Sequence, residues 1–482
     1  MTYKTPGVYV EEIPLFPPSV AEVETAIPAF IGYTAKAEKD GQPITEPLAI
    51  RSLKEYEQYF GKAAKEPEGT FEITIKETQD AQNKRTGIEG VVVSDPKKFP
   101  KYNLYYSMQL FFANGGGKCY IVSAGIIPDD GSGSPADDKL IEGINKLQAY
   151  DEPTMIVVPE GIYLTDDKYK TVMETSIKQC AKMKDRFAIV DVREQKDKDT
   201  KPEADAAAFR DKSPSDFGEI RYAAAYYPYL VTTIDRGVDI KSLKVKDHDV
   251  NGQDAPTATS LKDKTLEDVK KSANDVYNVL KAEIAKATTV ILPPSPAMAG
   301  IYARVDSSRG VWKAPANVSV ASVSAPHVIV THDQQAELNV DPTAGKSINV
   351  IRSFSGRGTI VWGGRTLDGN SNEWRYINVR RFFNMVEESV QKSTVWAVFE
   401  PNTKNTWVMV KSMIENYLIT KWQEGSLAGA KPDDAFYVKV GLGITMTADD
   451  ILNGIMNVEI GMAVARPAEF IILKFSHKMQ VS

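Results

Sequence analysis

The sequence predicts a protein of mixed α+β and α/β class with more than one domain. Its 482 residues exceed what one compact hydrophobic core usually serves, which suggests two or three domains. Between residues 119 and 192, short apolar runs alternate with amphipathic segments of helical length. This alternation is typical of right-handed βαβ crossovers and predicts an α/β domain with a parallel or mixed sheet. From residue 380 onward, two amphipathic helices and several short strands predict a C-terminal α+β domain.

The composition is that of an ordinary soluble globular protein, with 42% hydrophobic and 25% charged residues. The net charge of −6 comes without a basic stripe, so neither nucleic acid nor a membrane is expected as a direct partner. Cys119 and Cys180 lie far apart and are expected to be buried reduced thiols, which is compatible with synthesis in a reducing cytoplasm. The first residues resemble no signal peptide, and no apolar run is long enough to span a bilayer.

Residues 5–13 predict a short strand that prolines separate from the rest of the chain. Its central residues, with the two valines on one face, are Val8, Tyr9, Val10, Glu11 and Glu12. A lone strand can neither satisfy its own backbone nor bury its apolar face. It therefore pairs with a sheet of its own domain or with another chain, and the pattern leaves both possibilities open.

The middle of the chain predicts a series of elements around the βαβ region. Before this region we expect a strand at 26–33, a helix at 52–60, a charge-rich surface insertion or hairpin at 62–101, and a helix at 104–113. Within it we expect strands at 119–123, 154–158 and 187–192, with helices at 138–149 and 167–184. After it we expect a strand at 223–231, a polar loop or small decoration at 234–265, a helix at 266–286 and a strand at 290–292.

Two amphipathic helices are expected near the C-terminus, at 379–391 and 406–423. The first places Phe382, Phe383, Val386 and Val390 on one side, with Glu387, Glu388 and Lys392 facing away. The second repeats apolar residues at Trp407, Val410, Ile414, Leu418 and Trp422. Asn405 or Thr406 can cap its start, and Gly425 follows its end, where a left-handed residue is favoured.

Short strands are expected around these helices. The run WAVFEPN at 396–402 predicts one strand, and AFYVKVG and VEIGMAV predict two more. A last strand comprises Phe470, Ile471, Ile472, Leu473, Lys474 and Phe475. Both of its faces are apolar except at Lys474, so it also fits a central strand of the core.

Several of these motifs resemble the contractile tail sheath proteins of phages, R-type pyocins and phage-tail-like contractile injection systems. The resemblance rests on TPGVYVEEI and TAIPAFIGYT near the N-terminus, IYARVDSSRGVWKAPAN and GRGTIVWGGRTL further on, and VWAVFEPN, GSLAGAKPDDAFYVKV and RPAEFIILKF at the end. These motifs occur in the family's order. Residues 66–100 and 194–281 have no counterpart in the resemblance.

The resemblance implies a structural sheath subunit that polymerises helically around an inner tube and contracts to drive the tube through a target envelope. It implies an N-terminal arm and linker at 1–25, an outer α/β domain at 26–301 with insertions at about 62–101 and 234–265, and a sheath core domain at 302–482. The implied partners are other copies of the chain, sheath paralogues where a particle has them, an inner tube protein, a baseplate and a terminator or cap protein. The assembled location would be a phage tail or an extracellular tail-like particle.

The same resemblance suggests which segments meet other subunits. Residues Val8 to Glu12 would form the N-terminal arm, and Phe470 to Phe475 the C-terminal strand that joins a neighbour's sheet. The inner tube is expected to contact the second C-terminal helix and the loop after it. The corresponding candidates are Lys411, Glu415, Lys421 and Glu424.

No motif predicts catalysis. The run Gly115–Lys118 does not have the glycine spacing of a P-loop, and Cys119 stands where a P-loop has Ser or Thr. The run Gly356–Gly358 lacks the third glycine of a dinucleotide fingerprint. His327 and His332, if both lie on one strand, face opposite sides and cannot share a metal. We therefore expect no catalytic residue, cofactor or metal site. The alternative is a cytoplasmic α/β enzyme with an unidentified ligand, because such sheets host many activities.

Overall fold

The computed structural model describes residues 19–67, 70–82, 84–94, 100–194, 201–257 and 259–473. The chain forms two compact units. The larger unit comprises Thr25–Arg380, and the smaller unit comprises Arg381–Ser482 together with the N-terminal residues up to Glu24. The division thus lies about 80 residues beyond the boundary predicted after residue 301, because the intervening strands pair within the sheet of the larger unit.

A nine-stranded mixed sheet forms the centre of the larger unit, with the strand order β15-β18-β17-β10-β9-β8-β1-β7-β4. The strands are β1 (Pro28–Thr34), β4 (Leu48–Ile50), β7 (Cys119–Ile126), β8 (Met155–Val157), β9 (Phe187–Asp191), β10 (Ala223–Tyr227), β15 (Val318–Ser319), β17 (Ile348–Phe354) and β18 (Gly358–Val361). The inner strands from β17 to β7 pair in parallel, whereas β4, β18 and β15 pair antiparallel to their neighbours. The predicted βαβ region and mixed sheet are confirmed.

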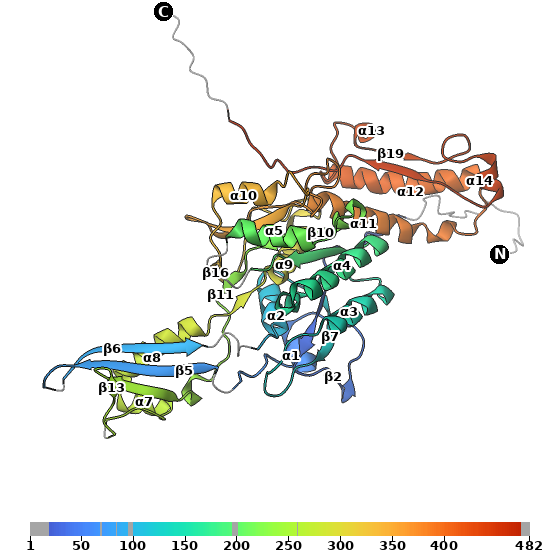
Figure 1. Ribbon diagram of the computed structural model, residues 1–482. Helices are drawn as coiled ribbons and strands as arrows, with labels where there is room; N and C mark the ends of the chain where they lie inside the picture. The colour runs from blue at the N-terminus through green and yellow to red at the C-terminus, as the bar shows by residue number, and fades with distance from the viewer. Residues whose placement is uncertain are drawn as a thin grey trace, which may run out of the picture. The chain divides into compact units, whose positions relative to one another are not determined.

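Helices cover both faces of this sheet and enclose a separate apolar core on each (Figure 1). One face carries α1 (Leu53–Phe60), α2 (Leu104–Ala113) and α9 (Ser295–Arg309); the other carries α3 (Asp137–Lys146), α4 (Asp166–Met183), α5 (Pro202–Lys212), α6 (Phe217–Ile220) and α10 (His332–Asn339). Gly300 allows α9 to approach α2 closely, since a Cβ there would lie 2.5 Å from the Phe111 carbonyl oxygen. Cys119 and Cys180 are buried free thiols, as predicted.

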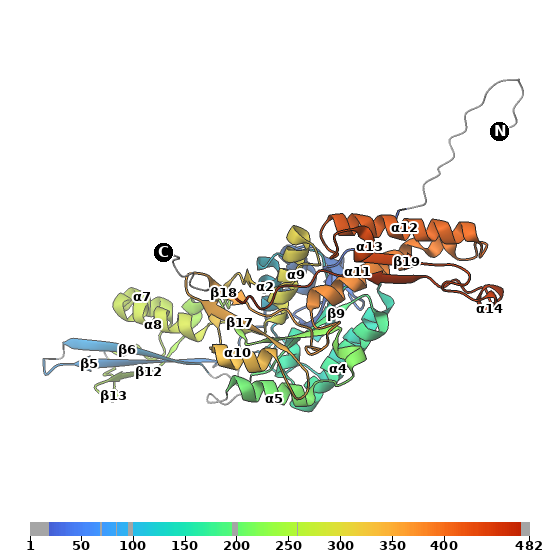
Figure 2. The ribbon, with the colours of Figure 1, turned by 90° about the horizontal axis from the view of Figure 1, so that it is seen from above.

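The two predicted insertions combine into one substructure. It contains β5 (Phe71–Gln79), β6 (Arg85–Ser94), β12 (Val245–Val250), β13 (Gln253–Asp254), α7 (Leu266–Ser272) and α8 (Asn274–Ala287). The hairpin predicted within 62–101 is β5–β6, and β12 joins it in parallel beside β5. Helices α7 and α8 cover one face of this four-stranded sheet over a core that includes Ile73, Ile75 and Leu280 (Figure 2).

Three predictions in this half of the chain were wrong in detail. The strand predicted at 223–231 is divided into β10 and β11 (Leu230–Thr232), which lie in different sheets because the chain turns at Pro228. The helix predicted at 266–286 is broken at Ala273, whose φ and ψ of −150° and 74° are not helical. The segment 234–265 contributes a paired strand, β12, to a sheet.

Two small sheets complete the larger unit. Strand β11 pairs with β14 (Ile291–Leu292) and β16 (Val323–Pro326), and β2 (Glu38–Lys39) pairs with β3 (Gln42–Pro43).

The smaller unit combines long helices with a two-stranded sheet. Its elements are α12 (Lys404–Gln423), α13 (Pro432–Ala435), β19 (Phe436–Lys439), α14 (Ala448–Leu452), β20 (Glu459–Met462) and most of α11 (Ile377–Ser393). Helices α11 and α12 lie side by side in both views (Figure 1, Figure 2). Gly425 follows α12 with a φ of +84°, as predicted, whereas the cap at the start of α12 is Thr403.

Two further predictions for this unit were wrong. The run at 396–402 forms no strand; the 3-10 helix Val395–Ala397 is followed by a loop in which Phe399 is fully exposed at a φ of +68°. An apolar run of this length needs a pairing partner to become a strand, and the described residues of the chain provide none there. Glu388 does not face away from the core, because it is buried and pairs with Lys392 at 2.7 Å.

A buried carboxylate fixes the junction of three elements in the larger unit. Glu160 accepts hydrogen bonds from the backbone nitrogens of Tyr33 at 2.8 Å, Asn103 at 3.1 Å and Leu104 at 3.2 Å. Because Leu104 is the first residue of α2, this carboxylate caps the helix from a distance in the sequence. Burial raises the pKa of Glu160 to about 8, against the three N–H donors, which lower it.

We predict that Leu280→Ala loosens the insertion substructure selectively. Leu280 is fully buried, and removal of such a side chain costs about 2–5 kcal/mol. Hydrogen exchange should accelerate in β5 and β12 but not in β9. The matched control is Asn278→Ala on the exposed side of α8, which should leave exchange unchanged. Equal acceleration in β9 would show that the substructure and the large sheet unfold together.

We also predict that stability falls as pH rises because of Glu160. Its folded pKa of about 8 lies above the ordinary glutamate pKa of 4.5, so the folded chain binds more protons between these values. The free energy of unfolding therefore decreases through this window, by at most about 1.4 kcal/mol per pH unit for one group. Denaturation midpoints from pH 5 to 8 should decline less in Glu160→Gln than in the wild type. An exposed control, Glu373→Gln, should follow the wild type, and an unchanged slope in Glu160→Gln would contradict the prediction.

Candidate binding groove

Two buried carboxyl groups, Asp191 and Glu160, could suggest enzyme chemistry, but both have structural roles. Asp191 ends β9 and accepts hydrogen bonds from the Ser295 backbone nitrogen at 2.8 Å and the Ser295 hydroxyl at 2.6 Å. Ser295 begins α9, so Asp191 caps this helix as Glu160 caps α2. Burial raises the pKa of Asp191 to about 7. Both carboxylates are thus committed to helix ends and not directed at a substrate.

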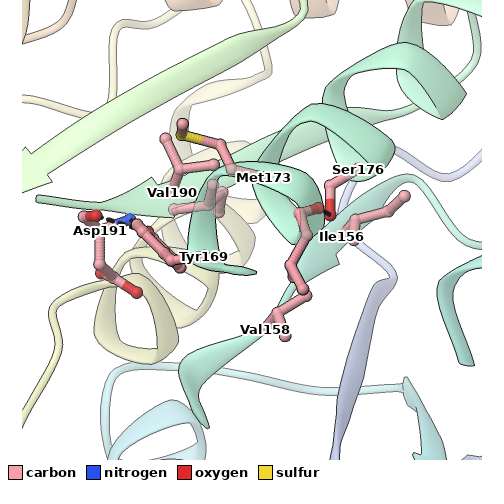
Figure 3. A pocket seen from close by; sticks show the side chains of 9 residues that line it. Ile156, Val158, Tyr169, Met173, Ser176, Val190 and Asp191 are labelled. Atoms are coloured by element: carbon pink, nitrogen blue, oxygen red, sulfur yellow. Dashed lines mark hydrogen bonds between the residues drawn. The ribbon is translucent and has the colours of Figure 1, made fainter. Parts of the chain in front are cut away.

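The cavity beside Asp191 is too small for a ligand. Figure 3 shows Tyr169, Met173 and Ser176 of α4 facing the strands that carry Ile156 and Asp191. The cavity measures about 10 Å³, close to the minimum space for a single water molecule. The Tyr169 hydroxyl donates a hydrogen bond to the Asp191 carbonyl oxygen at 2.5 Å, so this hydroxyl is already used within the chain.

The sequence motifs considered for ligands also have structural roles. Gly115–Lys118 connects α2 to β7, and Lys118 pairs with Glu152 at 2.5 Å. His327 contacts Glu194 at 2.5 Å, whereas His332 begins α10 and does not lie on a strand as expected. Across the ranges that the structure describes, no group of three His, Cys, Asp or Glu side chains could hold a metal ion. No helix in those ranges is long and apolar enough to cross a membrane.

The smaller unit has an apolar groove between α11 and α12 on one side and β20 on the other. Its volume is about 940 Å³. The helices contribute Val386, Val390, Val410 and Ile414, and the chain up to and within β20 contributes Val458 and Ile460. Polar side chains such as Glu387 and Gln391 also line the groove, but most of its lining is apolar, so an apolar occupant is favoured.

The groove runs beside an unpaired edge of the two-stranded sheet. Strands β19 and β20 pair antiparallel, with Phe436 opposite Met462 and Val438 opposite Ile460. Phe436 and Val438 are buried against the helices, whereas Tyr437 and Lys439 are exposed. In the part of the chain that the structure describes, each strand has the other as its sole strand partner. The outer edges of both strands therefore present backbone groups to a further strand.

The C-terminal segment is apolar and exposed. Phe470, Ile471, Ile472 and Leu473 have exposed fractions between 70% and 80%, and none of them belongs to a strand (Figure 1). The strand predicted at 470–475 is therefore absent from its described residues, and these are not part of a core. Lys474 and Phe475, like Val8 to Glu12 of the predicted N-terminal arm, lie outside the described residues.

The four predicted tube-contact residues do not form one exposed group. Lys411 and Glu415 lie one turn apart on α12, half-exposed, with 3.6 Å between their charged groups. Lys421, in contrast, is 7% exposed and pairs with Glu22 and, at 2.7 Å, with Glu424. A signal for this was present in the sequence, because Lys421 follows Ile414 and Tyr417 by seven and four residues on the buried face of the helix.

Comparisons with known proteins agree on one family. Residues 370–478 match the family model described as the phage tail sheath C-terminal domain. Tail sheath proteins of Vibrio phage KVP40 and Enterobacteria phage T4 are each 26% identical, over 121 and 127 residues. These matches cover 25% and 26% of this chain, and they span only 18% and 19% of the phage proteins.

Two solved structures are similar over the whole chain. The sheath complex of an extracellular contractile injection system, PVC, in the contracted state is 30% identical with a TM-score of 0.64, and the match covers 99% of both chains. A chain of the anti-feeding prophage (AFP) baseplate is 31% identical with a TM-score of 0.60, over 99% of this chain and 100% of that one. Identity at this level along the full length shows that the chain belongs to the family of contractile tail sheath proteins.

Proposed function

We propose that the chain is the repeating structural subunit of a contractile sheath, which polymerises helically around an inner tube and contracts to drive the tube through a target envelope. The observation that carries this proposal is the apolar groove beside an edge of β20 that no other described strand covers, in a chain whose residues 470–473 are apolar and exposed. Each feature is unfavourable in an isolated molecule, and each is resolved when one chain supplies a strand to the next.

The chemistry of the tail fits the groove. In an extended strand, alternate side chains point to opposite faces. One row of the C-terminal strand is then Ile471, Leu473 and Phe475, and the other is Phe470, Ile472 and Lys474. Addition of this strand beside β20 would satisfy backbone groups on both strands and place one apolar row in the groove. The N-terminal arm, with Val8 and Val10 on one face, would occupy the other edge of the same sheet.

A neighbouring subunit is the proposed donor of each strand. In the single chain the described tail residues do not cover the chain's own groove, since they remain exposed. A donor segment and an acceptor groove on different parts of one surface make a heterologous contact, and such contacts produce open helical polymers when the rotation does not close. Contraction would then release free energy stored at assembly, which needs no nucleotide hydrolysis by this chain.

The remaining partners follow from the same family. We assign Lys411 and Glu415 on α12 to the inner tube contact, and we withdraw Lys421 because its charge is used within the chain. A baseplate and a terminator are the proposed partners at the two ends, with paralogous sheath subunits where the particle has them. The whole-length likeness to PVC and AFP favours an extracellular contractile injection system, made in a bacterial cytoplasm, over a phage tail. No observation favours the enzyme alternative.

We predict that Ile460→Arg prevents polymerisation without unfolding the chain. Ile460 is half-buried and lines the groove, so the new guanidinium can reach solvent in the monomer but would be buried beneath an added strand. Negative-stain microscopy and sedimentation should show monomers with wild-type circular dichroism. The matched control is Glu459→Arg, which places the same guanidinium one residue away on the exposed face, with a larger change in net charge, and should still give tubes. Tubes of normal length from Ile460→Arg would contradict strand addition at this groove.

A further inference from the structure

The residues that precede the first strand of the large sheet are bound to the smaller unit, far away in the sequence. Two backbone N–H groups of this segment donate to serine hydroxyls of α11: Ala21 to Ser393 and Val23 to Ser389, both at 3.1 Å. Two residues of extended chain advance about 6.6 Å, and two serines four positions apart are separated by about 6 Å along a helix. The spacing of the serines therefore matches the spacing of alternate backbone amides.

The side chain between these two amides points to α12. The Glu22 carboxylate accepts a hydrogen bond from the Tyr417 hydroxyl at 3.3 Å and forms an ion pair with Lys421. Lys421 is 7% exposed and also binds Glu424 at 2.7 Å. Burial lowers the pKa of Lys421, and the carboxylates of Glu22 and Glu424 outweigh this effect and raise it above its usual range. The cation is therefore charged and held in a fixed position.

We propose that Ser389, Ser393, Tyr417 and Lys421 form an N-terminal anchor, which binds residues 21–23 and fixes the point at which the N-terminal arm leaves the subunit. This inference rests on the proposed function, because only an arm held by a neighbour puts the segment under load. The anchor delivers that load to α11 and α12, two long helices. It also limits the free length of the arm, since the next fixed point is Thr25, whose hydroxyl donates to Asp306 at 2.6 Å.

Release of the anchor would lengthen the arm. It would free residues 21–24, which add about 13 Å of contour at about 3.3 Å per residue. A longer tether can still reach a neighbour, but it holds the neighbour less firmly. The anchor is thus a positioning device for assembly and not a requirement for folding.

Hydrogen exchange on the full-length monomer tests the anchor independently of polymerisation. In the wild type, the amides of Ala21 and Val23 should be protected. Glu22→Gln and Lys421→Met should accelerate their exchange by about tenfold or more, which corresponds to about 1.4 kcal/mol of lost interaction. Exchange at Leu418 in the buried face of α12 should not change, which separates loss of the anchor from unfolding. The matched control is Glu24→Gln, because Glu24 is exposed two residues along the same segment and forms no ion pair with the residues that the structure describes.

Unprotected amides in the wild type, or unchanged exchange in both variants, would overturn the anchor. A second measurement tests its role under load: tubes of Glu22→Gln should dissociate at a lower guanidinium concentration than tubes of Glu24→Gln, and equal dissociation would refute the load-bearing role. If the exchange results hold while Ile460→Arg still forms tubes, the anchor stands and the proposed strand addition fails.

Discussion

The backbone of β19 and β20 has hydrogen-bonding groups along two outer edges, and among the described residues neither strand has a second strand partner. A two-stranded sheet is at best marginally stable in water, and here it is held by Phe436 and Val438 against the helices. The helices and β20 still leave an apolar groove of about 940 Å³ open beside one edge. A strand added from another subunit would form hydrogen bonds with the outer backbone groups and bury the apolar groove. The proposed architecture of the polymer depends on this strand addition.

The larger unit solves the same physical problem internally. Strands such as β9 and β10 are buried on both faces, with a separate core under each layer of helices. Two buried carboxyl groups of this unit accept hydrogen bonds from backbone N–H groups at helix N-termini. Glu160 caps α2, and Asp191 caps α9. The insertion substructure has an apolar cluster of its own, which includes Ile73, Ile75 and Leu280.

The N-terminal segment before Thr25 is held by the helices of the smaller unit. Its backbone amides find partners in the serines of α11, and its carboxylate finds a buried lysine of α12. These contacts join residues separated by more than 360 positions, and both partners belong to the same subunit. They also explain why Lys421, although basic and close to the end of a helix, is not free to meet a partner protein.

Local pattern was sufficient for much of the fold. The alternation of buried runs and amphipathic helices predicted β7 to β9 with α3 and α4, and Gly425 marked the end of α12. Some failures were local, such as the turn at Pro228 and the break at Ala273, and two others share dependence on distant partners. The charged run that contains β12 becomes a strand only beside β5, and the apolar run before Pro401 has no described strand to pair with. The groove and the anchor each need three or more segments that meet only after folding.

The most direct test of the account is a cryo-electron microscopy structure of tubes assembled from the full-length chain. We expect β19 and β20 to lie within a four-stranded sheet, with one added strand at each outer edge and both added strands from other subunits. Residues 470–475 and 8–12 should be the added strands, with an apolar row of one of them in the groove. A groove filled by the chain's own tail, or an edge of β20 that remains free in the tube, would contradict the account.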